Sequence, residues 1–159
     1  MSDPACRTQP AIPQAEEPGA MWLASVKDPP SIILTAWADS AYSLAEVPLG
    51  VRFDVVRATE CLGVRALDAL ANAAVSLGPV LYCRPRQAVE FLVPVGTAAT
   101  WEPLRGTVCA GRGGALLCPA PGMSRRGRTW LYPPVGDGVL TDSDLLRAHL
   151  LRAYARGRS

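Results

Sequence analysis

Fifteen prolines and fourteen glycines interrupt this chain of 159 residues so often that few long elements can form. Proline cannot donate a backbone hydrogen bond and glycine costs an element conformational entropy, so both residues favour turns between short elements. Only residues 66–77 and 142–156 have the pattern of a sustained helix. The sequence therefore predicts short strands and tight turns packed against one or two helices.

Apolar and β-branched runs between the turns have the composition of strands. The runs 80–83 and 89–93 flank Arg84-Pro85-Arg86-Gln87, and we expect them to form a hairpin. Residues 51–56 follow a proline and a glycine and are expected to form a central strand. Residues 128–132, which stop at a proline pair, are expected to form another.

A second hairpin is expected from residues 108–110 and 115–118, which are joined by the glycine-rich segment 111–114. Hairpins connect neighbouring antiparallel strands, so the expected sheet is mainly antiparallel. Together these patterns predict a single α+β domain, in which a mainly antiparallel sheet with hairpins packs against one or two helices.

The domain is expected to span residues 21–159. Residues 1–20 are proline-rich and polar, lack apolar periodicity, and are expected to form a disordered leader. Residues 21–26 and 32–37 are both apolar, and the intervening Asp28-Pro29-Pro30 prevents one continuous helix. The sequence does not distinguish a strand from a short helix at residues 32–37.

The last segment has the pattern of an amphipathic helix. Thr141 is its expected cap, and Asp142 and Asp144 lie in the first turn, where acidic side chains favour the helix dipole. Its expected inner face consists of Leu145, Leu146, His149, Leu150 and Ala153.

Charge is distributed unevenly along the chain. The net charge is +2, but residues 1–104 carry seven basic and eleven acidic side chains, whereas residues 105–159 carry nine arginines and three aspartates. The last third is therefore a candidate surface for an anionic partner, nucleic acid before others. The alternative is that these arginines only face water.

Cysteine and histidine usage argues against several classes of site. The five cysteines are odd in number and lack a C-x-x-C pair, so we expect no disulfide framework and a reducing, cytoplasmic setting. With one histidine, His149, no metal-ligand spacing is present, and neither a metal nor another cofactor is expected. No secretion signal or membrane-spanning run is recognisable, so the expected protein is soluble.

Two neighbouring segments together resemble part of a known family. Residues 111–121 place a glycine turn before an apolar strand that ends at proline, and residues 128–134 form an aromatic strand with its own proline stop. This order resembles the core of bacterial primase-polymerase domains, over roughly residues 50–134. The resemblance implies a degenerate relative of that family from an actinomycete plasmid or integrative element.

The catalytic positions of that family are largely replaced here. Family members hold two metal ions with an Asp-x-Asp pair at the end of a central strand, because nucleotidyl transfer needs paired carboxylates. Asp54 takes the first position, but Val56 takes the second. Gln87 or Ala88 stands near the place of the family's histidine, and the acid expected before the Gly-Gly strand is also missing.

Arginines cluster in the turns around these strands, and we expect them to converge at one end of the sheet, beside Trp130 and Tyr132. Phosphates and stacked bases would suit such a surface. The alternative for Trp130 is a place in the core. The candidate nucleic-acid contacts are Arg84, Arg86, Arg112, Arg125, Arg126, Arg128 and Trp130.

These observations lead to three functional hypotheses. The first is a non-catalytic protein that activates or regulates replication of a plasmid or integrative element by binding DNA or a replication protein. The second is a regulatory protein interaction module that does not bind nucleic acid. The third is an enzyme that holds a metal with Asp54 and either Glu90 or Asp68.

Overall fold

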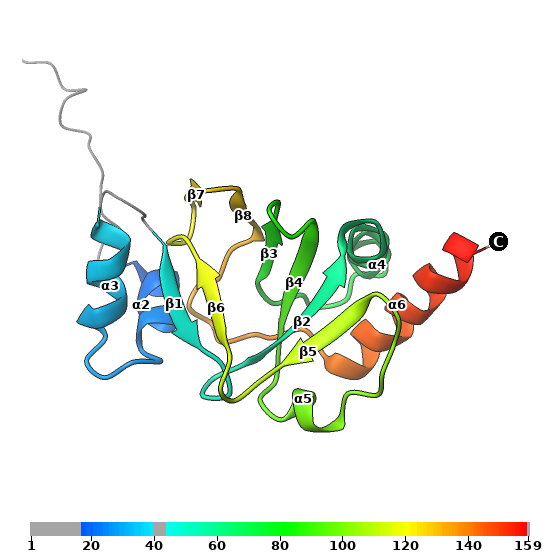
Figure 1. Ribbon diagram of the computed structural model, residues 1–159, viewed down its shortest axis with the longest axis horizontal. Helices are drawn as coiled ribbons and strands as arrows, with labels where there is room; N and C mark the ends of the chain where they lie inside the picture. The colour runs from blue at the N-terminus through cyan, green and yellow to red at the C-terminus, as the bar shows by residue number, and fades with distance from the viewer. Residues whose placement is uncertain (1–16, 40–43, 159) are drawn as a thin grey trace, which may run out of the picture.

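The computed structural model of the protein describes residues 17–39 and 44–158 (Figure 1). Residues 1–16 of the expected leader lie outside the described residues. Helix α2 (Pro18–Ala24) begins before position 21, however, so the described fold starts earlier than the expected domain. Proline suits this place because the first turn of a helix has no use for its missing N–H.

The larger sheet has six strands in the order β5-β2-β4-β3-β8-β7, and all neighbouring strands are antiparallel. The expected single α+β domain with mainly antiparallel strands is thus confirmed. Four of its strands, with the helices between them, follow the β-α-β-β-α-β order of a ferredoxin-like unit. The six strands are β2 (Asp54–Thr59), β3 (Val80–Cys83), β4 (Ala88–Val93), β5 (Thr107–Ala110), β7 (Ser124–Arg125) and β8 (Arg128–Tyr132).

A second sheet consists of β1 (Ala45–Pro48) and β6 (Ala115–Cys118), which pair antiparallel. The expected hairpin between β5 and β6 is therefore wrong, because β5 pairs with β2 and β6 with β1. The glycine segment between them carries the chain from one sheet to the other. Its Gly111 packs so closely that a Cβ there would lie 2.9 Å from Ala98 Cβ and 3.0 Å from Asp54 Oδ2.

Five helices are assigned among the described residues, more than expected. Residues 18–24 and 31–38 both form helices, which decides the ambiguity in this region. Figure 1 shows α2 and α3 beside β1, whereas α4 and α6 lie together at the other side of the larger sheet. The helices are α2 (Pro18–Ala24), α3 (Ser31–Ala38), α4 (Glu60–Asn72), α5 (Thr97–Thr100) and α6 (Ser143–Arg158).

The larger sheet separates two hydrophobic cores. The first core lies between this sheet, the β1-β6 pair, α2 and α3, and contains Val55, Leu81, Leu92 and Trp130. The second core lies against α4 and α6 and includes Val56. Because side chains alternate along a strand, β2 directs Val55 and Arg57 to the first side and Asp54 and Val56 to the second.

The cap of α6 differs from the expected one. Asp142 accepts the hydrogen bond from the Leu145 N–H at 2.9 Å, whereas Thr141 is fully buried and its Oγ1 accepts from the Gly78 N–H at 3.0 Å. Leu145 is exposed and does not belong to the inner face. Within residues 17–39 and 44–158, no helix has the length and apolar character needed to cross a bilayer.

Candidate nucleic-acid interface

Two hairpin turns meet at one end of the larger sheet. Strand β3 pairs with β8, so Cys83 lies opposite Arg128, and the Arg84 N–H donates to the Gly127 carbonyl at 2.9 Å. The β3-β4 turn and the β7-β8 turn are therefore neighbours. We call the arginines of the two turns the tip surface: Arg84, Arg86, Arg125, Arg126 and Arg128.

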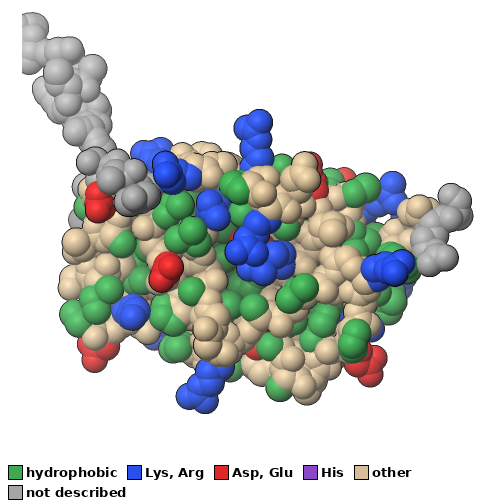
Figure 2. Space-filling view, in the orientation of Figure 1, with side chains coloured by type: hydrophobic (Ala, Val, Ile, Leu, Met, Phe, Trp, Pro, Cys, Tyr) green, Lys and Arg blue, Asp and Glu red, His purple; other side chains and the backbone are tan. Residues whose placement is uncertain are grey.

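Most of the tip surface is open to water. Arg84, Arg86, Arg125 and Arg126 are exposed, and Arg128 is half-buried. The Arg128 guanidinium donates to the Arg126 carbonyl at 3.4 Å. Figure 2 shows Lys and Arg side chains at the upper edge of the molecule, and others at the centre, the right side and the lower edge of the same face. Of the six arginines expected at one end of a sheet, the structure brings these five together and leaves out Arg112.

A buried ion pair lies on the first-core side of the same sheet. Arg57 Nε is 2.7 Å from Glu90 Oε2, and Glu90 is only 3% exposed. Burial raises the pKa of the Cys118 thiol, the charge of Glu90 raises it further, and Arg128 lowers it. Glu90 lies two residues after Ala88, where β4 begins next to the β3-β4 turn, so the ion pair is near the tip surface.

Sequence reasoning missed Arg57 as a part of this region. A signal was present, since β2 and β4 are otherwise apolar near their centres and each carries one charged residue of opposite sign there. In the register of the two strands, Arg57 lies directly opposite Glu90. Opposite charges on central strands indicate a cross-strand pair.

Arg112 does not belong to the tip surface. It follows β5 near the Asp54 end of β2, and its backbone packs against Gly50. The β3-β4 turn lies at the other end of β2, where Thr59 pairs with Ala88. A strand of six residues separates the two places by about 17 Å at roughly 3.3 Å per residue.

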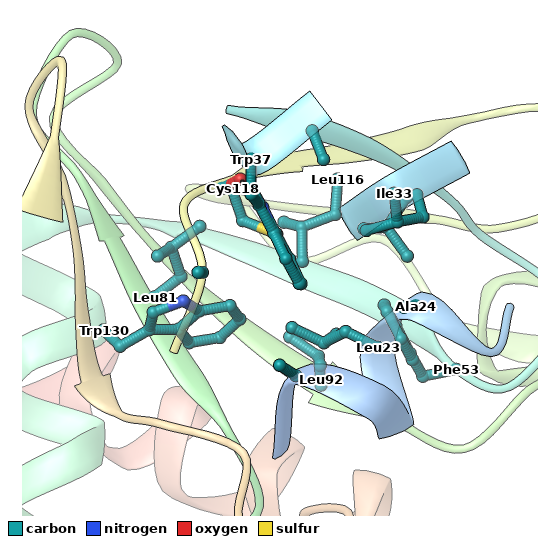
Figure 3. Packing of buried hydrophobic residues seen from close by; sticks show 14 of the residues in the cluster. Leu23, Ala24, Ile33, Trp37, Phe53, Leu81, Leu92, Leu116, Cys118 and Trp130 are labelled. Atoms are coloured by element: carbon teal, nitrogen blue, oxygen red, sulfur yellow. Dashed lines mark hydrogen bonds between the residues drawn. The ribbon is translucent and has the colours of Figure 1, made fainter. Parts of the chain in front are cut away.

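Trp130 is also absent from the tip surface, because its side chain is buried. It is 7% exposed, and its Nε1 donates to the Pro119 carbonyl at 2.9 Å. Figure 3 shows the indole beside Leu81 in the first core. Tyr132 is partly exposed but lies at the far end of β8 from Arg128. The tip surface thus presents arginines without either of these aromatic residues.

The Asp54 side chain is buried and hydrogen-bonded to backbone amides. Asp54 is 2% exposed, and its Oδ2 accepts hydrogen bonds from the Gly96 N–H at 3.0 Å and the Ala98 N–H at 2.9 Å. Its Oδ1 is buried without a hydrogen-bond partner. Burial, with a smaller effect from the charge of Asp54, raises the pKa of the Cys109 thiol to about 11. Through its two hydrogen bonds to Gly96 and Ala98, the Asp54 carboxylate stabilises the turn at the start of α5.

The three acids of the metal-enzyme hypothesis face different directions. Asp54 lies on the second-core side of the larger sheet, whereas Glu90, opposite Arg57, lies on the first-core side. Asp68 is exposed on α4. In the part of the chain that the structure describes, no group of three or more metal-ligating side chains comes together.

Replacing Asp54 with alanine is expected to lower the free energy of unfolding by about 1–3 kcal/mol, because the Gly96 and Ala98 amides lose their acceptor. Loss of the unpartnered Oδ1 offsets part of this cost. Urea denaturation measures the change. The exposed Asp68→Ala is the control and should stay within about 0.5 kcal/mol of the original protein. Equal stabilities for both variants would contradict the proposal that Asp54 stabilises the turn at the start of α5.

Comparisons of the chain with protein-family models, with curated proteins and with solved structures gave no match.

Proposed function

We propose that the protein is a non-catalytic, replication-associated protein that binds DNA through the tip surface. The observation that carries this proposal is the pairing of β3 with β8, which brings two arginine-bearing turns together. Arginine suits phosphate recognition because its planar guanidinium donates several hydrogen bonds and keeps its charge. A surface of this kind binds nucleic acid mainly by neutralising phosphates.

The form of nucleic acid follows from the side chains of the tip surface. Single-strand binding without sequence preference usually combines a basic groove with aromatic side chains on which bases stack. Trp130 is buried, and Tyr132 lies at the opposite end of β8. Phosphate contact without stacking favours the regular backbone of a duplex, so duplex DNA should bind more tightly than a single strand of equal length.

The absence of catalysis and the link to replication have separate support. Asp54 takes the first position of the family's metal-binding pair, and its carboxylate accepts hydrogen bonds from the amides of Gly96 and Ala98. Val56 takes the second position and is buried in the second core. The resemblance of residues 111–134 to primase-polymerase domains connects the chain with replication of a plasmid or integrative element. Activation or regulation of that replication is the role we propose.

Removing two tip arginines tests the proposal. We expect Arg84→Ala with Arg125→Ala to reduce the slope of log affinity against log salt by about 2 on a 24-base-pair duplex, because each lost phosphate contact contributes about 0.9. Fluorescence anisotropy between 50 and 200 mM salt measures this slope. The matched control, Arg52→Ala with Arg112→Ala, removes the same charge from exposed residues near Gly50, away from the tips, and should leave the slope almost unchanged.

Two results would overturn parts of the proposal. No salt-dependent binding by the unaltered protein at 50 mM salt would reject DNA binding and favour the alternative, a regulatory protein interaction module. Primer synthesis by the purified protein with manganese and nucleotides would reject the non-catalytic assignment. Equal losses in the tip variant and in its control would place the contact elsewhere on the surface.

A further inference from the structure

Three depressions on the α4 side of the molecule share Arg65. One is lined by Arg65 together with Arg86 of the β3-β4 turn. The next is lined by Arg65 and Arg105, and the third, of about 580 Å³ between α4 and α6, by Arg65, Arg152 and Arg156. Because Arg65 borders all three, they form one continuous surface, which we call the α4 track.

Basic side chains outnumber acidic ones along the α4 track. Its five arginines are accompanied by two carboxylates, Glu60 and Asp68. The Tyr82 hydroxyl, a neutral group, donates a hydrogen bond to Glu60 Oε1 at 2.9 Å. This hydrogen bond is the main reason that the pKa of Tyr82 is raised. The track therefore has an excess of positive charge for an anionic partner.

The α4 track continues the tip surface without a break. Arg86 belongs to both, since it is exposed on the β3-β4 turn and also lines the first depression. From there the track passes Arg65 to the surface between α4 and α6, which Arg152 and Arg156 line.

We propose that the α4 track provides a second row of phosphate contacts for duplex DNA, beyond the row made by the tip surface. The inference rests on the proposed DNA binding and names the path of the duplex from the β3-β4 turn across the surface where α4 packs against α6. The partner is recognised by its regularly spaced phosphates, which match a row of arginines better than an isolated anion does.

A purely structural role for these arginines makes a different prediction. Arg152 and Arg156 lie toward the C-terminal end of α6, where cations stabilise a helix through its dipole. A Cβ on Gly157 would lie 2.8 Å from Arg65 Nη1, so the Arg65 side chain packs against the last turn of α6. A structural role would lower the melting temperature of a variant without changing the salt dependence of DNA binding.

The test uses Arg105→Ala with Arg152→Ala, since both side chains are exposed and Arg65 keeps its contact with Gly157. On the 24-base-pair duplex we expect the salt slope to fall by about 2. The loss of affinity between 50 and 200 mM salt then becomes about 10-fold smaller. Arg105→Lys with Arg152→Lys keeps both charges and should restore most of the slope. Asp68→Asn removes an acid from the track and should tighten binding several-fold.

The outcomes separate this inference from the proposed function. An unchanged slope in Arg105→Ala with Arg152→Ala, while Arg84→Ala with Arg125→Ala loses about 2, would overturn the α4 track and leave the tip surface in place. A lower melting temperature with an unchanged slope would assign the arginines to helix stability and also overturn the inference. Absence of salt-dependent binding by the unaltered protein would overturn the proposed function itself.

Discussion

Replacing Trp130 with alanine is expected to lower the free energy of unfolding by about 3–5 kcal/mol, the usual cost of removing a buried aromatic side chain. The indole is buried in the first core beside Leu81, and its Nε1 holds the Pro119 carbonyl at 2.9 Å. Trp130 lies on β8 and Pro119 follows β6, so the variant loosens the contact between the two sheets. Guanidinium denaturation followed by circular dichroism measures the effect.

Two further variants separate packing from DNA contact. Trp130→Phe keeps most of the ring and loses the Nε1 donor, so we expect a smaller cost of about 1–3 kcal/mol for the buried carbonyl left without it. Leu131→Ala, next in sequence and 42% exposed, should cost less than 1 kcal/mol. If Trp130→Ala keeps full stability but loses DNA binding, the side chain contacts bases and its assignment to the core is wrong.

Replacing Arg57 with leucine is expected to cost about 3 kcal/mol. The change leaves Glu90 buried without its cation, and an uncompensated buried charge is strongly destabilising. We place the cost at the lower end of the usual range because the Arg57 side chain is 23% exposed and water therefore already weakens the pair. Urea denaturation of Arg57→Leu measures the loss directly.

A double-mutant cycle checks this explanation. Arg57→Leu with Glu90→Leu removes both charges and replaces them with apolar groups, so it should be more stable than Arg57→Leu alone. Glu90→Leu alone should cost less than Arg57→Leu, because Arg57 can turn its charge toward water. Additive losses in the double variant would show that the ion pair is not the cause of the destabilisation.

The local hairpin of β3 and β4 could be predicted from sequence because its evidence is local. Two apolar runs flank a four-residue turn, and the strands pair as that spacing requires. The start of α4 could not be predicted in the same way. The sequence indicated a helix only from residue 66, because Gly63 lowers the helix propensity of residues 60–65. A Cβ at Gly63 would lie 2.7 Å from Val89 Cβ, so close packing of α4 on β4, not propensity, determines the residue there.

The wrong β5-β6 hairpin shows where local patterns stop being informative. Two short apolar runs joined by a glycine turn are equally compatible with a hairpin and with a passage between sheets. The partner of β6 is β1, with Ala45 opposite Cys118, and no spacing rule connects segments so far apart in sequence. Arg112 was misplaced for a similar reason, because the pairing of β5 with β2, which places Arg112 at the Asp54 end of β2, is also a long-range contact.

The candidate site was predictable to the extent that it depends on charge. Arginines in turns are visible in the sequence, and five of the six meet at the tip surface. The burial of Trp130 depends on the β1-β6 pair, which covers the first core, and therefore on long-range packing. The α4 track was not predicted because Arg65, Arg86, Arg105 and Arg152 lie on four separate segments that only the fold brings together.

The pairing of β1 with β6 also constrains the order in which the chain can assemble. Residues 45–48 can pair only after residues 115–118 have reached them. Closing this long loop costs conformational entropy before the contact contributes any stabilisation. During synthesis, α2 and α3 emerge before β6, and their buried side chains Leu23, Ile33 and Trp37 have no completed core to enter until β6 has followed. A nascent chain that ends before residue 115 should therefore expose these apolar surfaces and depend on chaperones, whereas the finished chain buries them.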